Sequence, residues 1–250
     1  MKSRAAKSSK VFDTLDELSR SVACEIVDIA RRAIQERDLF HLVLSGGNTP
    51  KRLYELLATE EFRRQIDWMK THLYWADERF VAHTDTESNF KLVDDLLIKH
   101  IESLPAGNVH PIPTIDYDPE TAAMKYESEL RQNFRADWPS FDLILLGIGT
   151  DGHTASLFPG TSGISNLNET VKWVAPSMAP IEPRQRITLT YPAINHARKI
   201  IFLVDGADKR EVLDAIFSSI DEESEIYPAA RIFAEDGSTR WFVSRSALAK

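Results

Sequence analysis

Apolar residues recur every three or four positions near the start of the chain and then gather into a short continuous run. Over residues 15–36 this spacing predicts an amphipathic helix, whose apolar face is Leu18, Val22, Ile26, Ile29 and Ala33. Residues 41–44 follow as a short run of mostly apolar side chains, which is typical of a buried strand.

The same alternation continues to the end of the chain. Further strands are predicted at residues 73–76, 141–146, 186–190, 199–204 and 241–243. Helical spacing resumes at Pro50, at residues 89–101, at residues 118–134, in a helix that ends at Phe217, and in a short terminal helix. Apolar strands that alternate with amphipathic helices predict an α/β fold, a Rossmann-like, doubly wound and mostly parallel sheet with helices on both faces. Residues 11–250 are expected to form a single domain.

Two of these helices begin with capping signals. Thr49 is expected to be the N-cap of the second helix, with Pro50 as its first helical residue. Ser88 is expected to cap the helix at residues 89–101.

Glycine-rich or charged segments stand directly after four of the predicted strands. They lie at residues 45–49, 77–79, 147–153 and 205–209. In open α/β sheets the ligand crevice lies outside the carboxyl ends of the strands. These four segments are therefore expected to converge on one site.

Charge and cysteine content narrow the class of protein. The 250 residues carry a formal net charge of −8. Binding to nucleic acid or to an anionic membrane needs clustered Lys and Arg, so neither partner is expected.

Cys24 is the only cysteine, which excludes an internal disulfide and fits the cytoplasm. Its side chain is expected to be buried on the first helix. Residues 1–10 are basic and lack an apolar segment behind them, so a disordered start is expected rather than a secretion signal.

The first glycine segment has the features of a phosphate-binding turn. Gly46 and Gly47 precede a helix start, where backbone N–H groups and the helix dipole can face an anion. The segment lacks the motifs of nucleoside-triphosphate and dinucleotide sites, so no nucleotide cofactor is expected. A tight turn without a ligand is the alternative interpretation.

The segment at residues 147–153 carries the strongest candidate for acid–base chemistry. Gly147 and Gly149 permit close backbone approach, and Asp151 and His153 follow on the same loop. Histidine titrates near neutral pH, so His153 can take a proton from water and return it within one turnover.

Other candidates are charged side chains at the remaining strand ends. Asp77 and Arg79 follow the strand at residues 73–76, and Arg186 and Lys209 are possible phosphate cations, although each of these also fits a solvated surface. No set of His, Cys, Asp and Glu has the spacing of a metal site, and no serine nucleophile motif is present. The expected chemistry is therefore acid–base catalysis without a metal or other cofactor.

Together these motifs resemble the 6-phosphogluconolactonase family from about Val11 to Ala247. The matching segments are LSGGNTP at residues 44–50, DER at 77–79 with SNF at 88–90, GIGTDGHTASLFPG at 147–160, RITLT at 186–190, and Gly206 with Lys209. The family commonly has Ser where this chain has Asn48, and Asn can still donate to a phosphate.

The resemblance implies hydrolysis of 6-phospho-D-glucono-1,5-lactone to 6-phosphogluconate in the oxidative pentose phosphate pathway. Our mechanistic hypothesis is that His153 is the general base on water and that Asp151 orients or polarises its imidazole. Either Arg79, which follows the candidate residue Asp77, or loop N–H groups would stabilise the oxyanion. The resemblance further implies that the phosphate is held by Gly46, Gly47, Asn48, Thr49, Arg186 and Lys209. The sequence leaves open whether the protein is a monomer or a homodimer.

Two alternatives share the expected fold. Glucosamine-6-phosphate deaminases typically carry a glutamate before the proline that ends the histidine segment, and this glutamate belongs to their proton-transfer machinery. This chain has Phe158 at that position, before Pro159. A sugar-phosphate-binding regulator without catalysis usually carries an added DNA-binding domain, and the segment before residue 11 is too short for one. Both alternatives are less consistent with these residues than a lactonase.

Overall fold

The fold is described from a computed structural model, over residues 8–160, 171–218, 226–235 and 237–248. Its main sheet has the strand order β1-β10-β9-β6-β2-β3-β5, and all neighbouring strands run parallel. In that order the strands are β1 (Ser8–Phe12), β10 (Ser238–Ser244), β9 (Lys199–Val204), β6 (Leu143–Leu146), β2 (Phe40–Leu44), β3 (Thr71–Trp75) and β5 (Val109–His110). The α/β class and the mostly parallel sheet predicted above are confirmed.

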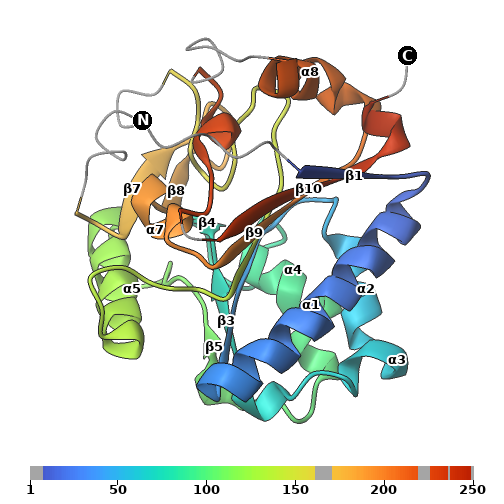
Figure 1. Ribbon diagram of the computed structural model, residues 1–250. Helices are drawn as coiled ribbons and strands as arrows, with labels where there is room; N and C mark the ends of the chain where they lie inside the picture. The colour runs from blue at the N-terminus through green and yellow to red at the C-terminus, as the bar shows by residue number, and fades with distance from the viewer. Residues whose placement is uncertain (1–7, 161–170, 219–225, 236, 249–250) are drawn as a thin grey trace.

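Helices cover the sheet, and their apolar faces form the core with it. They are α1 (Leu15–Arg37), α2 (Lys51–Ala58), α3 (Glu60–Arg63), α4 (Asn89–Leu96), α5 (Pro119–Phe134), α7 (Tyr191–Asn195) and α8 (Arg210–Ser218). In Figure 1, α1 and α2 lie side by side on one side of the sheet, and α5 lies on the other. The predicted apolar face of α1 is buried, as expected, because Leu18, Val22, Ile26 and Ala33 have no exposed surface.

A second, antiparallel sheet was not foreseen. It consists of β4 (Asp77–Arg79), β8 (Gln185–Leu189) and β7 (Val174–Met178), in the order β4-β8-β7. Residues 77–79 were expected to be a loop because all three are charged. They form a strand because the chain crosses from the end of β3 to pair with β8, with Arg79 opposite Arg186.

The predicted bounds of two elements and the predicted burial of Cys24 are wrong. Residues 1–10 were expected to be disordered, and residues 1–7 lie outside the described residues. Residues 8–10 instead belong to β1, which pairs with β10. The strand was not predicted because its side chains show no alternation of apolar and polar positions. The helix expected at residues 89–101 ends at Leu96 and continues as a 3-10 helix, Ile98–His100. Cys24 is exposed, since it falls on the outer face of α1.

The two predicted caps have different outcomes. Ser88 caps α4 as expected, because its side chain accepts a hydrogen bond from the backbone N–H of Lys91. Thr49 is not the N-cap of α2; Pro50 occupies that position without a side-chain bond, and the helix begins at Lys51. Thr49 is thereby left at the mouth of the glycine turn.

The order of the strands creates a crevice between β2 and β6. The chain leaves β2 for β3 and β5 in one direction, returns to β6 on the other side of β2, and continues to β9 and β10. The segments that follow β2 and β6 therefore diverge at a topological switch point, where open α/β sheets bind their ligands.

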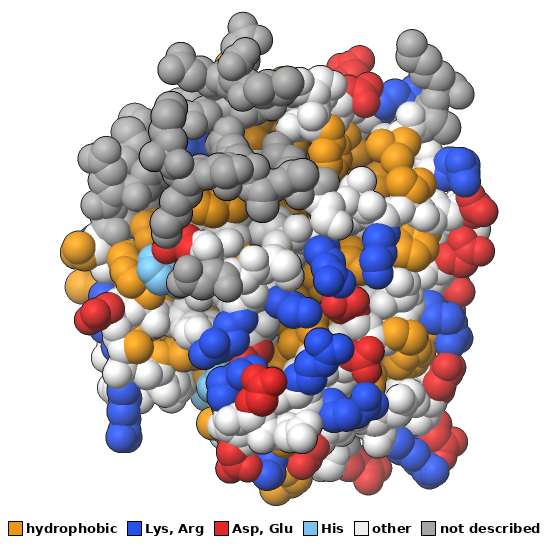
Figure 2. Space-filling view, in the orientation of Figure 1, with side chains coloured by type: hydrophobic (Ala, Val, Ile, Leu, Met, Phe, Trp, Pro, Cys, Tyr) orange, Lys and Arg blue, Asp and Glu red, His pale blue; other side chains and the backbone are white. Residues whose placement is uncertain are grey.

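Two features bear on the partners of the chain, the hydropathy of its described helices and the charge of the face seen in Figure 2. No helix among the described residues is long and apolar enough to cross a membrane. On the face seen in Figure 2, basic and acidic side chains lie among one another. An anionic ligand would therefore depend on local donors rather than on a broad positive field.

Candidate active site

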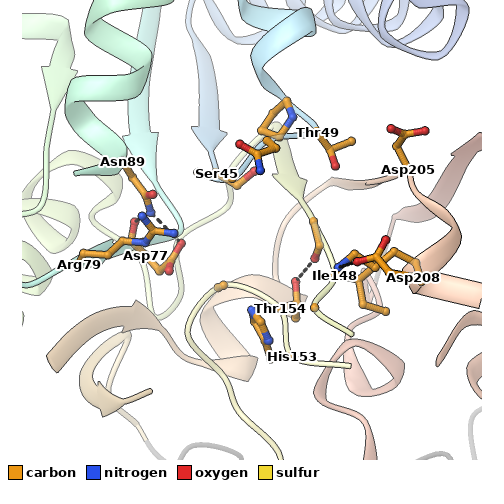
Figure 3. A pocket seen from close by; sticks show the side chains of 18 of the residues that line it. Ser45, Thr49, Asp77, Arg79, Asn89, Ile148, His153, Thr154, Asp205 and Asp208 are labelled. Atoms are coloured by element: carbon orange, nitrogen blue, oxygen red, sulfur yellow. Dashed lines mark hydrogen bonds and ion pairs between the residues drawn. The ribbon is translucent and has the colours of Figure 1, made fainter. Parts of the chain in front are cut away.

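A pocket of about 400 Å³ opens at the carboxyl ends of the parallel strands. Its wall includes residues from the segments after β2, β3, β6 and β9, so the predicted convergence of residues 45–49, 77–79, 147–153 and 205–209 is confirmed. Figure 3 shows Asp77, Arg79 and Asn89 grouped on one side, Thr49, Asp205 and Asp208 on the other, and His153 on the loop that faces them.

His153 is held by the loop that follows β6. Its Nδ1 lies 2.5 Å from Asp151 Oδ1, and the same carboxylate oxygen accepts a hydrogen bond from the backbone N–H of His153 at 3.1 Å. Burial raises the pKa of Asp151, but these hydrogen bonds from His153 outweigh it, so the pKa lies below its ordinary value. An ionised Asp151 that accepts from Nδ1 leaves Nε2 as the basic nitrogen of the ring.

The glycine at position 149 permits this arrangement. A Cβ there would lie 2.0 Å from His153 Nδ1 and 2.6 Å from Asp151 Oδ1, which no side chain allows. The backbone N–H of Gly149 donates to the carbonyl of His153 at 2.8 Å, which closes the loop on itself. The close backbone approach predicted from the glycines is confirmed at this position.

The turn after β2 and Lys209 form the opposite wall. Gly46, Gly47, Asn48 and Thr49 all line the pocket, and Gly47 has a φ of 93°, in the left-handed region that glycine tolerates best. Lys209 also lines the pocket, where its Nζ lies 2.9 Å from Asp208 of the same turn. Backbone N–H groups and one ammonium group thus occur together, as in a phosphate site.

Asp77 and Arg79 reach the pocket from β4. Asp77 is 7% exposed, and its Oδ2 accepts a hydrogen bond from Ser156 Oγ at 2.6 Å. Arg79 Nη1 donates to the backbone carbonyl of Glu87 at 2.6 Å, which holds the guanidinium at the pocket edge. Both predicted residues therefore share the cavity with His153.

Two predicted site residues lie outside the pocket wall. Asp151 stands behind His153, and Arg186 is paired with Arg79 across the β4–β8 ladder. Arg186 is 5% exposed and its Nη1 is buried without a partner among the described residues. Burial lowers the pKa of Arg186, and the charge of Arg79 lowers it further. Direct contact of Arg186 with a phosphate stays a prediction.

Three residues of the pocket wall were not among the predicted site residues, and Phe158, which separates the chain from the deaminases, lies beside His153. Asn89, Asp205 and Asp208 line the pocket, and the ring of Phe158 lies 4.7 Å from that of His153. Asn89 lies in the SNF segment of the family motif, so the resemblance was the only available signal for it. No group of three or more His, Cys, Asp or Glu among the described residues could hold a metal ion.

Comparison with known proteins assigns the chain to a family. The family described as glucosamine-6-phosphate isomerases/6-phosphogluconolactonase matches residues 13–241. The 6-phosphogluconolactonase of Synechocystis sp. is 38% identical over 233 residues, 92% of this chain and 92% of that protein. The chain belongs to the 6-phosphogluconolactonase family. Another of these lactonases, from Haemophilus influenzae, is 39% identical over 210 residues, 83% of this chain and 86% of that protein.

Solved lactonase structures have the same fold. The 6-phosphogluconolactonase of Trypanosoma brucei superimposes with a TM-score of 0.81 at 27% identity, over 96% of this chain and 97% of that chain. A monomeric glucosamine-6-phosphate deaminase gives a TM-score of 0.79 at 20% identity, over 96% of this chain and 98% of that chain, which shows the common fold alone. Lactonases and deaminases therefore have to be separated by the residues of the site.

Proposed function

We propose that this chain hydrolyses 6-phospho-D-glucono-1,5-lactone to 6-phospho-D-gluconate, the lactone step of the oxidative pentose phosphate pathway. Membership of the lactonase family supports the reaction class. The observation that carries the proposal is the pair formed by His153 and Asp151 at a pocket that also holds the glycine turn and Arg79.

The catalytic step is proton transfer by His153. His153 Nε2 takes a proton from water as the water oxygen forms a bond to the lactone carbonyl carbon. Arg79 or loop N–H groups stabilise the resulting oxyanion. Collapse of this intermediate breaks the bond between that carbon and the ring oxygen, and the ring oxygen takes the proton back from His153. Asp151 keeps the imidazole oriented in both steps.

The phosphate occupies the side of the pocket opposite Arg79. Backbone N–H groups of Gly46, Gly47 and Asn48, with Thr49 and Lys209, are its proposed partners. The predicted contact of Arg186 with the phosphate is not part of this arrangement, because Arg186 lies behind Arg79 and outside the pocket wall. This arrangement leaves the lactone ring between the phosphate and His153.

The position next to His153 argues against deamination. Phe158 occupies the place where deaminases typically carry a glutamate, and it is 6% exposed with its ring against the imidazole. A phenyl ring cannot transfer a proton. The intact His153–Asp151 pair also disfavours a binding protein without catalysis.

The proposal includes a cytoplasmic location. The chain has one cysteine, Cys24, and therefore no intrachain disulfide that would need an oxidising compartment.

The test is proton release from freshly generated 6-phosphogluconolactone at near-neutral pH. We expect rapid hydrolysis by the wild-type protein and a loss of about 10²–10⁴-fold in His153→Ala, the contribution of a general base. The matched control is His196→Gln, since His196 also lies near a carboxylate, 3.6 Å from Glu235, but does not line the pocket.

The deaminase alternative is tested in the same preparation by ammonia release from glucosamine 6-phosphate. Ammonia release, or a His153→Ala protein that hydrolyses the lactone at the wild-type rate, would contradict the proposal.

A further inference from the structure

Asn89, the first residue of α4, forms part of the pocket wall and contacts Asp77 directly. Its side-chain Nδ2 donates to the backbone carbonyl of Asp77 at 2.9 Å and lies 3.3 Å from Asp77 Oδ1. Both contacts are to oxygen atoms, so the amide nitrogen must face Asp77 and the amide oxygen must face away. The orientation of the carboxamide is thereby determined.

The amide oxygen of Asn89 faces the glycine turn on the other side. A Cβ on Gly46 would lie 1.7 Å from Asn89 Oδ1, so position 46 must be glycine while Asn89 keeps this orientation. Asn89 is 2% exposed, and its Oδ1 has no hydrogen-bond partner among the described residues. One side chain therefore spans the space between β4 and the turn after β2.

The backbone of Asn89 is held by the residue next to Asp77. Glu78 accepts hydrogen bonds from the N–H groups of Asn89 at 2.7 Å and Phe90 at 2.8 Å, and from Ser88 Oγ at 3.1 Å. Glu78 is 1% exposed and occupies the N-terminal end of α4, where a carboxylate satisfies free N–H groups. Consecutive residues of β4 thus hold both the backbone and the side chain of Asn89.

The second oxygen of Asp77 is held from another segment. Ser156 Oγ donates to Asp77 Oδ2 at 2.6 Å, while Oδ1 faces Asn89. The carboxylate therefore lies between one neutral donor from α4 and one from the segment that follows His153. Its plane is set by both donors.

We propose that Asn89 is a positioning residue for lactone hydrolysis, which sets the orientation of the Asp77 carboxylate and its distance from the glycine turn. This inference rests on the proposed function, and it takes Asp77, a candidate catalytic residue that lines the pocket, to face the lactone. Asn89 acts through Asp77 and Gly46 and not on the reacting atoms. Its loss should lower kcat more than it raises KM, since among the proposed phosphate ligands only Gly46 lies against Asn89, whereas Lys209 and the rest of the turn keep their places.

The decisive variant is Asn89→Asp, which has nearly the same shape. Its protonated carboxyl group can still donate to Asp77, whereas its ionised form places two carboxylates side by side. We expect the ratio of variant to wild-type kcat to fall about 10-fold between about pH 5 and pH 7.5, because the variant loses its donor as it ionises. Burial raises the pKa of Glu78, which accepts from the Asn89 backbone N–H, to about 7, and taking the ratio to wild type divides out the pH dependence that both proteins share through it.

Two further variants keep the test independent of folding defects. Asn195→Asp is the matched control, since Asn195 is also buried and donates to the carbonyl of Arg231, but does not line the pocket. Its kcat ratio should stay flat with pH. Asn89→Ser removes the contact with Asp77 without adding a charge, and should lower kcat about 10-fold or more at all pH values, with KM changed less than about 3-fold.

The outcomes separate the two proposals. If the wild-type protein does not hydrolyse the lactone, the proposed function and the positioning role both fail. If it does, and the Asn89 variants keep kcat within about twofold of wild type with a flat pH ratio, only the positioning role is overturned. An equal pH-dependent loss in Asn195→Asp would also overturn it, because the effect would then follow from any buried charge.

Discussion

Among single residues, Lys209 shows how the charge of the pocket is balanced before a ligand binds. Its Nζ lies 2.9 Å from Asp208, so the proposed phosphate cation is partly neutralised by a carboxylate on the same turn. Asp208 is largely exposed, and exposed ion pairs of this kind contribute little to stability. An incoming phosphate has to compete with Asp208 for the ammonium group.

Asp208→Asn should therefore improve binding of the phosphorylated substrate. We expect KM for 6-phosphogluconolactone to fall about two- to five-fold with kcat unchanged, and KM for unphosphorylated gluconolactone to stay the same. Steady-state kinetics at low ionic strength measures both values, because salt screens exposed charges. Asp214→Asn removes the same charge from the exposed side of α8 and is the control. A higher KM in Asp208→Asn would contradict this role.

Among the structural elements, β2, β3 and β5 bring together three histidines, none of which lines the pocket. His72 Nδ1 lies 2.9 Å from His110 Nε2, His110 Nδ1 lies 2.6 Å from Glu129, and the His41 ring contacts those of His72 and Phe134. Burial, and to a smaller extent the charges of His72, His110, Arg198 and Arg37, lower the pKa of His41 to about 4.

This cluster predicts a loss of stability in mild acid. Between pH 6.5 and about 4 the unfolded chain binds a proton at His41 that the folded protein does not, so the free energy of unfolding falls as the pH is lowered. The protonation of His41 lowers the free energy of unfolding by on the order of 3 kcal/mol, and this decrease is complete below about pH 4. Urea unfolding at a series of pH values measures it.

The variant that tests this is His41→Phe, which keeps an aromatic ring against Phe134 and cannot take a proton. Its unfolding free energy should depend less on pH over the same range, whereas the exposed His100→Gln should keep the wild-type dependence. An unchanged slope in His41→Phe would show that His41 does not titrate as described.

In the whole molecule, the pocket joins parts of the chain that lie far apart in sequence. Its wall combines residues after β2, β3, β6 and β9, and unfolding of the sheet would separate them. A ligand that binds there stabilises the folded state as a unit, because the unfolded chain has no such site.

The product 6-phospho-D-gluconate should therefore raise the thermal unfolding midpoint. At a concentration of 100 times its Kd the expected gain is about 2.7 kcal/mol, which corresponds to about 5–10 °C for a domain of this size. Differential scanning calorimetry measures the shift, with D-gluconate as the control that lacks the phosphate. Equal shifts for both compounds would contradict a phosphate site in the pocket.

Much of the fold and of the site was predictable from local sequence. The buried strands, the long helices and the loop with Asp151 and His153 follow from side-chain patterns within a few residues of one another. The convergence of four loops followed as well, because parallel strands place their carboxyl ends at one edge of a sheet. The edge strand β1 was missed, since its residues are mostly exposed and show no alternation.

By itself the sequence determined the α/β alternation, the glycine turn and the family motif around His153, because each depends on neighbouring residues. Only the tertiary structure decided that residues 77–79 form a strand, that Arg79 lies opposite Arg186, and that Ser156 reaches across 79 positions to Asp77. Asn89 obtained its place between Asp77 and Gly46 in the same way. Such contacts leave no local pattern, since they form between segments that the folded sheet brings together.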